Sequence, residues 1–347
     1  MISLKVKNIV KETADAVTIQ FERPTGDFNY LPGQFVTLYL NLKGESIKRS
    51  YSFSSSPFLD YEPAITVKKV EGGKVSSYLV NDLKIGDIIS AEEPLGNFCT
   101  EPKPQNVRTV VLLAGGSGIT PLFSMAKSIL SIENNTKVYL IYANRSENDI
   151  IFRKQIADLQ TNNGSRFHAI HTLSQGSSSW YGLRGRVTRE NMPTLLEQLP
   201  VIFPKNAEYF ICGPEGMMNE VVAGLKEIGV AAGNINKERF THAPAPQAAT
   251  VKNISFPVSV EFTQKGVKQH FKVKENQTLL EGAKEAGIRI RSSCETGVCT
   301  SCMCTLTDGE VDMGDNDTLT SNEIAKGFIL TCISYPKSQE IKFETEV

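Results

Sequence analysis

The first hundred residues alternate apolar and polar side chains in several short runs. Residues 17–21, 35–39 and 64–70 each alternate with a period of two, which is the period of a half-buried strand. Turn-forming residues separate these runs at 24–26, 31–33, 71–73 and 85–87. Short strands at such spacing predict a small antiparallel β-barrel, which we assign to residues 1–103.

The pattern changes beyond residue 103. Residues 107–113 form a continuous apolar run, typical of a strand that is buried on both faces. Apolar positions three and four apart then predict a helix through Leu122, Met125 and Ile129. Strands at 137–143, 166–173 and 208–213 alternate with helices at 152–159 and 217–228. This alternation predicts a doubly wound parallel α/β sheet over residues 104–240.

A stretch rich in proline and alanine, residues 241–252, predicts an extended linker. Beyond it, alternating runs at 258–263 and 267–273 flank a Gln-Lys-Gly turn and predict a hairpin. Thr278 is placed to cap a helix over 279–286, which Gly287 would end. This order of elements predicts a β-grasp domain over residues 253–347.

Composition narrows the class of protein. The chain has 347 residues, enough for two or three domains that each bury a core. A net charge of −1 argues against nucleic acid as an electrostatic partner. No apolar stretch approaches the roughly 18 residues of a membrane span, and the first residues contain no signal-peptide pattern. We therefore expect a cytoplasmic protein, whose seven cysteines stay reduced.

Four cysteines carry the most specific pattern in the chain. Cys294, Cys299 and Cys302 have the spacing C-x4-C-x2-C, and Cys332 follows on a separate segment. This is the spacing of a plant-type [2Fe–2S] cluster, in which three thiolates on one loop surround the irons and a fourth completes the site. The small residues between the cysteines let backbone N–H groups approach the cluster sulfurs. We predict that these four cysteines ligate a [2Fe–2S] cluster.

A disulfide or a zinc site would account for the cysteines less well. Disulfides are typical of secreted proteins, and zinc sites usually contain two C-x2-C pairs. Cys304 lies at the start of an apparent strand and is interpreted as a structural thiol. The residues from Cys294 to Glu323 include seven acids and no lysine or arginine, a pattern that is usually a solvated face but can also steer a basic partner.

Two stretches of the predicted barrel contain groups that suit a flavin nucleotide. In Arg49-Ser50-Tyr51-Ser52, the arginine offers a fork for a pyrophosphate and the tyrosine a ring for stacking. Gly72 and Gly73 precede serines at the expected start of a helix, which is an arrangement that binds anions. Each pattern alone is more often an exposed strand or a turn.

The predicted sheet domain contains a glycine-rich loop after its first strand. Gly116 and Gly118 allow a pyrophosphate to approach the backbone, and Pro121 suits the first turn of the following helix. Cys212, at the end of a later strand, precedes Gly213-Pro214. A lone cysteine at a strand end is usually a small core residue.

Together and in this order, the motifs R-x-Y-S, G-x-G-I-T-P and C-G-P resemble those of the ferredoxin–NADP reductase superfamily, fused here to a plant-type ferredoxin. The resemblance implies a Greek-key flavin barrel, bound FAD with FMN as the alternative, and NADH or NADPH as the electron donor. Ser52, Thr120 and Cys212 are then the candidates for hydride transfer. The cofactor-binding residues implied by the resemblance are Arg49, Ser50, Tyr51, Ser52, Val67, Lys74, Val75, Ser76, Gly116, Gly118, Thr120, Pro121, Arg145, Ser146, Pro214 and Phe240.

The choice of nicotinamide nucleotide stays open. Arg145 and Ser146 follow the second strand of the sheet, where an arginine and a serine can bind a 2′-phosphate. Arg145 can equally stack on adenine or lie in a solvated loop. His168 and His171 fall on opposite faces of a strand and are more typical of core or surface residues.

The order flavin, nicotinamide, ferredoxin resembles the reductase components of phenylacetyl-CoA epoxidase and ketosteroid hydroxylase type oxygenases. That resemblance implies a reductase that passes electrons from NAD(P)H to a partner oxygenase or hydroxylase. The alternatives are a redox-sensing or electron-transfer subunit without its own nucleotide turnover, and a reductase for a membrane desaturase or a carotenoid hydroxylase.

Overall fold

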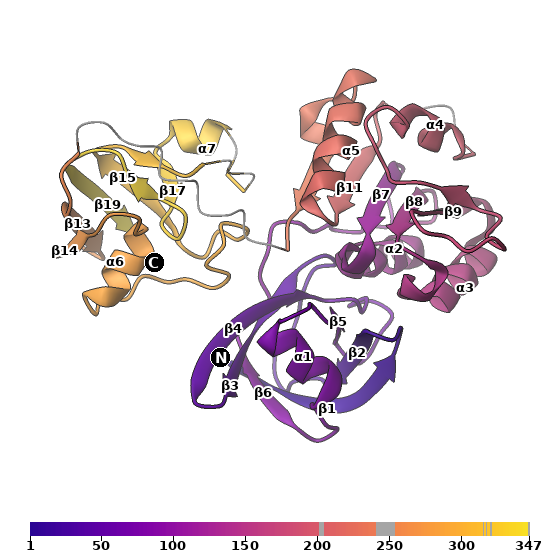
Figure 1. Ribbon diagram of the computed structural model, residues 1–347, viewed down its shortest axis with the longest axis horizontal. Helices are drawn as coiled ribbons and strands as arrows, with labels where there is room; N and C mark the ends of the chain where they lie inside the picture. Colours follow the sequence, from indigo (N-terminus) through magenta and orange to yellow (C-terminus); the bar gives the residue numbers. More distant parts are fainter. Residues whose placement is uncertain (201–204, 241–253, 315, 317, 320, 346–347) are drawn as a thin grey trace. The chain divides into compact units, whose positions relative to one another are not determined.

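The structure is a computed structural model that describes residues 1–200, 205–240, 254–314, 316, 318–319 and 321–345. It contains two compact units, Met1–Phe240 and Thr241–Val347, which are described separately (Figure 1). The predicted linker, 241–252, lies outside the described residues, and the predicted domain boundaries stay predictions.

The first unit begins with an antiparallel sheet of six strands in the order β4-β3-β6-β1-β2-β5. A bridge between Phe53 and Ile65 joins the end of β4 to β5, so that the two edges of the sheet meet. In β1, Leu4 and Val6 are buried in the interior while Lys5 is exposed, as the period-two pattern requires. The elements are β1 (Ile2–Lys11), β2 (Ala16–Phe21), β3 (Phe35–Leu42), β4 (Glu45–Ser52), β5 (Ala64–Lys68), α1 (Lys74–Asn81) and β6 (Ile88–Ala91).

A second sheet in the same unit contains six parallel strands in the order β10-β9-β8-β7-β11-β12. Helices α2 and α3 cover one face, and α4 and α5 cover the other (Figure 1). The strands are β7 (Thr109–Gly115), β8 (Lys137–Asn144), β9 (Phe167–Leu173), β10 (Leu183–Arg184), β11 (Glu208–Cys212) and β12 (Ile235–Glu238). The helices are α2 (Ile119–Ile132), α3 (Arg153–Asn163), α4 (Met192–Glu197) and α5 (Glu215–Glu227), with short 3-10 turns at Gly116–Gly118, Glu147–Asp149, Gly164–Arg166 and Ala232–Asn234.

The apolar run of β7 explains why this sheet is covered twice. Val110 and Leu112 belong to the core beneath α2, whereas Val111 and Leu113 belong to the core beneath α4 and α5. All four side chains are at most 1% exposed. The prediction of a doubly wound sheet is confirmed, although β7 begins at Thr109, two residues later than expected.

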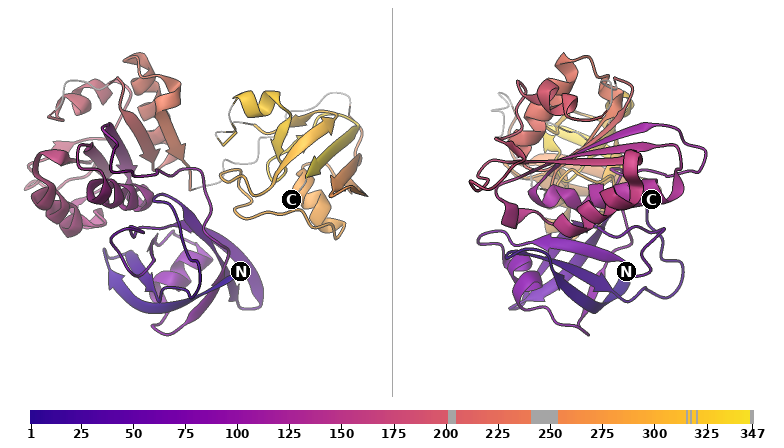
Figure 2. Two further views of the ribbon diagram at one scale, coloured as in Figure 1. Left: turned by 180° about the vertical axis from the view of Figure 1, so that it is seen from behind. Right: turned by 90° about the vertical axis from the view of Figure 1, so that its right-hand side faces the viewer.

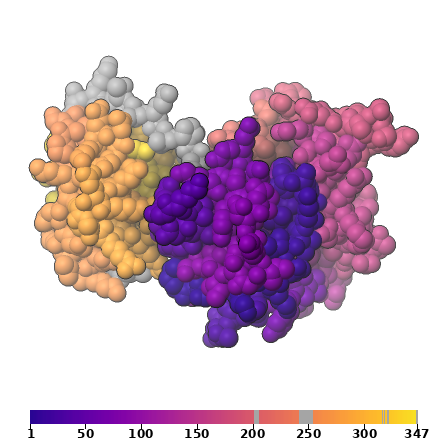
Figure 3. Space-filling model, turned by 60° about the horizontal axis from the view of Figure 1, so that its bottom comes forward, coloured from indigo at the N-terminus to yellow at the C-terminus, as the bar shows by residue number. Residues whose placement is uncertain are grey.

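The barrel and the parallel sheet pack against each other within the first unit. The surface of the barrel, indigo to purple, borders that of the parallel-sheet domain, magenta (Figure 3). The segment that joins them carries Phe98, whose ring contacts Phe210 of β11 edge-on at a centroid distance of 5.7 Å. Apolar packing therefore continues from the connecting segment into the core of the sheet.

The second unit is a β-grasp domain, in which a mixed sheet in the order β14-β13-β19-β15-β17 is covered by a helix (Figure 2). β13 and β14 form the predicted hairpin, and β13 pairs in parallel with β19. Thr278 caps α6, as the sequence predicts, and Glu281 completes a reciprocal capping box with it. The elements are β13 (Val258–Gln264), β14 (Val267–Val273), α6 (Leu279–Glu285), β15 (Met303–Asp308), β16 (Val311–Asp312), α7 (Ser321–Ala325), β17 (Phe328–Leu330), β18 (Tyr335–Pro336) and β19 (Glu340–Thr345).

Candidate cofactor and electron-transfer sites

The end of β4 holds the R-x-Y-S motif in a regular antiparallel ladder with β3. The Arg49 guanidinium is exposed and, among the described residues, donates only to the carbonyl of Lys48, over 2.7 Å. Ser50 shares a hydrogen bond of 2.8 Å with Thr37 on β3. Burial raises the pKa of the Tyr51 phenol, so this ring stays neutral. β4 therefore presents a guanidinium fork and an uncharged ring, which suit a phosphate and a planar ring system.

A tight turn leads from β5 into α1 and depends on the Ser76 hydroxyl. This hydroxyl accepts a hydrogen bond from Val70 N over 3.1 Å and donates to Gly73 O over 3.4 Å. A Cβ at Gly73 would lie 2.6 Å from the Ser76 oxygen, which explains the glycine. The Ser76 side chain is thus already used to shape the turn.

The first turn of α1 supplies backbone donors for an anion. Lys74, Val75 and Ser76 are its first residues, and N–H groups at this position have no acceptor within the helix. The Lys74 ammonium pairs with Glu45 of the β4 hairpin over 2.6 Å. The side chain of Val67 is buried in the barrel core, so only its main chain can face a ligand. These donors fit the pyrophosphate of a flavin nucleotide.

The glycine-rich loop of the parallel sheet is held by two side chains. Gly116 has a φ of +52°, a conformation that suits glycine, and its carbonyl accepts from the Tyr142 phenol over 2.9 Å. The Thr120 hydroxyl donates to Ser117 O over 3.1 Å. Pro121 lies in the first turn of α2, where an N–H group is not needed. The loop and the N-terminus of this 14-residue helix form a site suited to a pyrophosphate.

This loop packs directly against the end of β11. A Cβ at Gly118 would lie 2.1 Å from Cys212 O, and one at Gly115 would lie 2.6 Å from Pro214 Cδ. Side chains at either glycine would therefore separate the two segments. The structure brings the predicted residues Gly116, Gly118, Thr120, Cys212 and Pro214 to one edge of the sheet.

A buried carboxylate joins this edge to the barrel. Glu238 lies beside Cys212 in the parallel register of β11 and β12, and it is 6% exposed. The Ser52 hydroxyl, at the end of β4, donates to Glu238 Oε2 over 3.3 Å. Burial, and to a smaller extent the charge of Glu238, raises the pKa of the Cys212 thiol well above its ordinary value. Cys212 is therefore a neutral thiol at neutral pH.

Glu238 was not predicted from the sequence. Its strand reads Ile-Asn-Lys-Glu, which has neither an alternating nor a continuous apolar pattern. The only signal was topological, because ligands bind at the carboxyl ends of parallel strands and β12 ends there beside β11.

Arg145 and Ser146 follow β8, but their side chains differ in the contacts they already make. Arg145 is exposed. The Ser146 hydroxyl donates to Asp149 over 2.7 Å in a capping box. Burial opposes ionisation of Asp149, but hydrogen bonds from Ser146 and the charge of Lys68 outweigh it and lower its pKa. A phosphate bound at Ser146 would therefore face the Asp149 carboxylate. A phosphate bound at Arg145 would leave the hydrogen bond between Ser146 and Asp149 in place.

Phe240, the predicted aromatic cover of the flavin, is the last described residue of the first unit and is 46% exposed. It follows Arg239 and Glu238 directly. A ring of this size that is nearly half exposed at the end of the sheet can cover a planar ligand.

The four predicted cluster ligands lie together in the second unit. Cys302 Sγ and Cys332 Sγ are 3.3 Å apart, and the Cys294 thiol is within hydrogen-bonding reach of those of Cys299 and Cys332. Thr296 N donates to Cys294 Sγ over 3.4 Å. These contacts link the four thiols into one group, and a backbone donor is directed at one of them, which fits a [2Fe–2S] cluster.

Cys304 differs from these four. It lies within strand β15, paired with Ile329 of β17, and shares the apolar core of the domain with Cys302 and Cys332. Burial raises the pKa of its thiol to about 12. These surroundings agree with the predicted structural role.

The predicted acidic run is partly neutralised by lysines from elsewhere in the domain. Glu295 pairs with Lys284 over 2.5 Å, and Asp308 pairs with Lys342 over 2.8 Å. Asp312 pairs with Lys337 over 3.3 Å. Asp315 and Asp317 lie outside the described residues. The described part of the run therefore carries less net charge than the sequence suggests.

Comparison with known proteins agrees with this division into sites. Residues 1–99 match the model of the oxidoreductase FAD-binding domain, residues 112–223 that of the oxidoreductase NAD-binding domain, and residues 262–337 that of the 2Fe-2S iron-sulfur cluster binding domain. The chain is 31% identical to one subunit of the 1,2-phenylacetyl-CoA epoxidase from Escherichia coli, across 98% of this chain and 96% of that protein. The chain belongs to the iron–sulfur flavoprotein reductases.

Two further proteins extend the likeness over the full length of this reductase. The ferredoxin reductase component of 3-ketosteroid-9-alpha-monooxygenase from Rhodococcus rhodochrous is 31% identical, with 98% of this chain and 96% of that protein covered. The structure of phthalate dioxygenase reductase has the same fold, with a TM-score of 0.61 at 23% identity over 99% of this chain and 97% of that one. The predicted family, fold class and cofactor classes are thus confirmed. Across the described residues, no helix has the length and apolar character needed to cross a membrane.

Proposed function

We propose that this reductase takes a hydride from NAD(P)H onto FAD and delivers single electrons through a [2Fe–2S] cluster to a partner oxygenase or hydroxylase. The contact between Ser52 and Glu238 carries the proposal, because it joins the flavin strand of the barrel to the nicotinamide edge of the sheet. The three matched domains supply the binding functions in the order that such electron transfer requires.

The residues at this junction orient the reactants and control protons. When bound, the flavin and the cluster supply hydride acceptance and one-electron transfer, respectively. Ser52 offers a hydroxyl that Glu238 orients by accepting its proton in a hydrogen bond. Cys212 stays protonated because its thiol is fully buried, so it supports the end of β11 from within the core and does not act as a nucleophile. Thr120 acts on the glycine-rich loop through Ser117.

The flavin nucleotide is held by charge at one end and by packing at the other. Arg49 and the N–H groups of Lys74, Val75 and Ser76 bind its pyrophosphate, while the Ser76 hydroxyl keeps the turn in shape. Tyr51 and Phe240 pack on its ring system. FAD is favoured over FMN because the barrel matches an FAD-binding domain.

The proposed class of electron-acceptor protein comes from the names of the relatives of this chain. Their names describe subunits of an epoxidase and of a monooxygenase, so an oxygenase or hydroxylase is the expected acceptor, while its substrate does not touch this chain. Electrons are proposed to leave the protein through the cluster that is bound by Cys294, Cys299, Cys302 and Cys332. We place the protein in the cytoplasm, a compartment in which cysteines stay reduced.

A division of labour between the two units tests the proposal. A protein that ends at residue 240 should keep NAD(P)H-dependent reduction of ferricyanide, which accepts electrons from a flavin, because this unit contains both nucleotide sites. It should lose most reduction of cytochrome c. A full-length Cys332→Ser protein should show the same pattern, since it loses only the cluster.

Equal activity of the truncated and complete proteins toward a partner oxygenase would show that electrons do not leave the protein through the cluster. The alternative of an electron-transfer subunit without its own nucleotide turnover makes a different prediction. On that alternative, anaerobic NAD(P)H would leave the yellow colour of the purified flavoprotein unchanged, whereas the proposed function requires that it bleach.

A further inference from the structure

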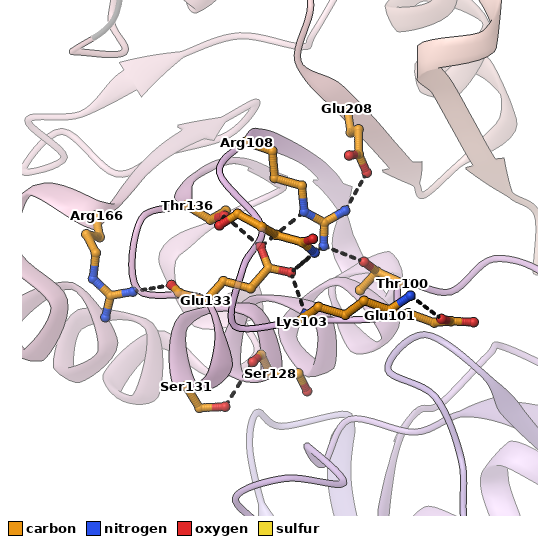
Figure 4. Close-up of polar contacts among 11 residues, drawn as sticks. Thr100, Glu101, Lys103, Arg108, Ser128, Ser131, Glu133, Thr136, Arg166 and Glu208 are labelled. Atoms are coloured by element: carbon orange, nitrogen blue, oxygen red, sulfur yellow. Dashed lines mark hydrogen bonds and ion pairs between the residues drawn. The ribbon is translucent and has the colours of Figure 1, made fainter.

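The segment that joins the barrel to the parallel sheet is held at one buried carboxylate. Glu133 directly follows α2, and its side chain is 0% exposed. It accepts hydrogen bonds from three residues of the connecting segment (Figure 4): from Lys103 N over 3.3 Å, from Asn106 Nδ2 over 2.8 Å and from Arg108 Nη2 over 2.7 Å. A second bond, from Arg108 Nε over 3.1 Å, makes the ion pair bidentate.

Arg108 extends this contact to two other parts of the unit. Its Nη1 donates to Glu208, the first residue of β11, over 2.7 Å, and its Nη2 also donates to Thr100 Oγ1 over 2.9 Å. Thr100 N in turn donates to the carbonyl of Pro32 in the barrel over 3.1 Å. A continuous set of polar contacts therefore runs from the barrel through Arg108 to α2 and β11.

Close packing accompanies these polar contacts. Gly33 follows Pro32, and a Cβ there would lie 2.2 Å from Phe98 O and 2.4 Å from Met125 Cε of α2. The barrel turn, the connecting segment and α2 thus approach one another so closely that only glycine fits at this position.

The ion pair is charged at neutral pH. Burial opposes ionisation of Glu133, but hydrogen bonds from Arg108, Thr136 and Asn106 outweigh it and hold the pKa of its carboxyl below the ordinary value. Burial likewise lowers the pKa of Arg108, and Glu133 and Glu208 raise it above its ordinary value. Loss of Arg108 would leave the buried Glu133 carboxylate without its counter-charge, whereas loss of Glu133 would leave Arg108 paired with Glu208 alone. The pair therefore fixes both side chains in one geometry.

Helix α2 also contacts the barrel along its length. The Ser124 hydroxyl donates to Ser55 O over 2.6 Å, and the Ser128 hydroxyl contacts Ser56 Oγ over 2.8 Å. Positions 124 and 128 lie on one face of the helix. The N-terminus of the same helix begins at the glycine-rich loop. α2 is thus in contact with the nucleotide loop at one end, the barrel in its middle and Glu133 at its far end.

We infer that Glu133 and Arg108 are positioning residues for hydride transfer, which hold the barrel and the parallel sheet at the separation that the reaction needs. This inference rests on the proposed function. Hydride transfer depends steeply on the distance and angle between donor and acceptor, so a displacement of about 1 Å can cost on the order of 100-fold in rate. Glu133 follows the end of α2 that is remote from the glycine-rich loop, and Arg108 precedes β7, so both act through the connecting segment and α2.

The test compares Glu133→Gln with a matched control at the same end of α2. Arg166 donates to the carbonyls of Glu133 and Leu130 over 2.9 Å and 3.1 Å, but its contacts lie wholly within the sheet domain. Arg166→Gln should therefore loosen the helix end without releasing the connecting segment. Asn106→Ala removes one bond from the connecting segment to Glu133 and keeps the ion pair.

Four quantities are measured on the full-length holoprotein: the limiting rate of flavin reduction at saturating NAD(P)H, the nucleotide Kd, the thermal midpoint, and amide hydrogen exchange. In Glu133→Gln we expect the limiting rate to fall about tenfold or more, with the nucleotide Kd within about twofold, and exchange to rise over residues 99–108. Asn106→Ala should show the same pattern with a smaller fall in rate. Arg166→Gln should lower the thermal midpoint and raise exchange at the end of α2, with the limiting rate within about twofold.

An equal fall in rate in Arg166→Gln and Glu133→Gln would overturn the inference, since the effect would then follow stability. An unchanged limiting rate of flavin reduction in Asn106→Ala, despite faster amide exchange over residues 99–108, would also overturn the inference. Asn106→Ala therefore provides the test if Glu133→Gln does not fold. Failure of the proposed function is recognised separately, because the unaltered protein would then not bleach with NAD(P)H.

Discussion

Ser52 on β4 donates a hydrogen bond of 3.3 Å to Glu238 on β12, although the two residues are 186 positions apart in the chain. Both side chains are buried, with exposures of 4% and 6%. This contact joins a hydroxyl from the barrel to a carboxylate from the parallel sheet. In the proposed function, flavin and nicotinamide meet at this junction.

Replacement of Glu238 by glutamine tests this arrangement. Glutamine keeps the shape but removes the charge that orients Ser52, and a hydrogen bond to a charged group contributes about 1.5–3 kcal/mol. If this hydrogen-bond free energy stabilises the transition state of hydride transfer, its loss should slow flavin reduction by roughly 10- to 100-fold. Stopped-flow bleaching of the flavin by NAD(P)H gives the rate, and Ser52→Ala should produce a loss of similar size. Wild-type rates in both variants would show that the contact is only structural.

The sequence allowed the sites to be predicted where chemistry demands particular residues close together in the chain. Gly116 and Gly118 had to be glycines because a Cβ at position 118 would strike Cys212 O at 2.1 Å, while position 116 has a φ of +52°. Cys294, Cys299 and Cys302 have the spacing that a plant-type [2Fe–2S] cluster requires of three thiolates on one loop. Such local requirements are visible in the order of residues alone.

Contacts between distant segments were not predictable in this way. Glu238 ends a strand that lacks a strand pattern, and its importance depends on β12 pairing with β11. Arg108 and Glu133 are ordinary charged residues in the sequence, and only the fold buries them against each other. The lysines that neutralise part of the acidic run were not predictable for the same reason, since Lys284 and Lys342 approach it from other elements.

The cluster assignment predicts a clear division among the cysteines. Serine in place of Cys294, Cys299, Cys302 or Cys332 should lower the bound iron well below two atoms per chain and remove the visible cluster absorption, because serine is a poorer ligand for this cluster. Cys304→Ser is the matched control, since Cys304 lies in the same domain but within strand β15, where it pairs with Ile329 of β17. It should keep its iron, and loss of the cluster in this control would refute the assignment. Iron analysis and the visible spectrum provide the measurement.

Arg49 and Ser76 should affect the flavin differently. Arg49→Ala removes the phosphate fork and should raise the flavin Kd at least tenfold, because hydrogen bonds to charged groups contribute about 1.5–3 kcal/mol. Lys48→Ala, its neighbour on β4, should change the Kd by less than about twofold, since successive side chains point to opposite faces of a strand.

Ser76→Ala should act through the turn that Ser76 shapes with Val70 and Gly73. It should lower stability by about 1 kcal/mol, the usual contribution of one neutral hydrogen bond. Flavin fluorescence titration and thermal unfolding measure the two effects. Heat release of the flavin, run against FAD and FMN standards, identifies the nucleotide. A normal flavin affinity in Arg49→Ala would exclude the proposed phosphate contact.

The nucleotide preference should depend on Arg145 and not on Ser146. Arg145 is exposed at the end of β8, whereas the Ser146 hydroxyl is bonded to the Asp149 carboxylate over 2.7 Å. A 2′-phosphate near Ser146 would face the negative charge of Asp149, whereas Arg145 offers an opposite charge without breaking that contact. Since a charged hydrogen bond contributes about 1.5–3 kcal/mol, Arg145→Ala should raise the KM for NADPH about tenfold or more and the KM for NADH by less than about twofold.

Lys154→Ala is the control for this last prediction. Lys154 is a cation on the nearby helix α3, but it pairs with Asp158 over 2.5 Å on an exposed face. Its loss should leave both KM values within about twofold, because exposed pairs of this kind contribute only about 0–1 kcal/mol. Equal changes for NADH and NADPH in Arg145→Ala would mean that this arginine contacts a part common to both nucleotides, such as the adenine ring. In that case the preference would have to arise elsewhere along the edge of the sheet.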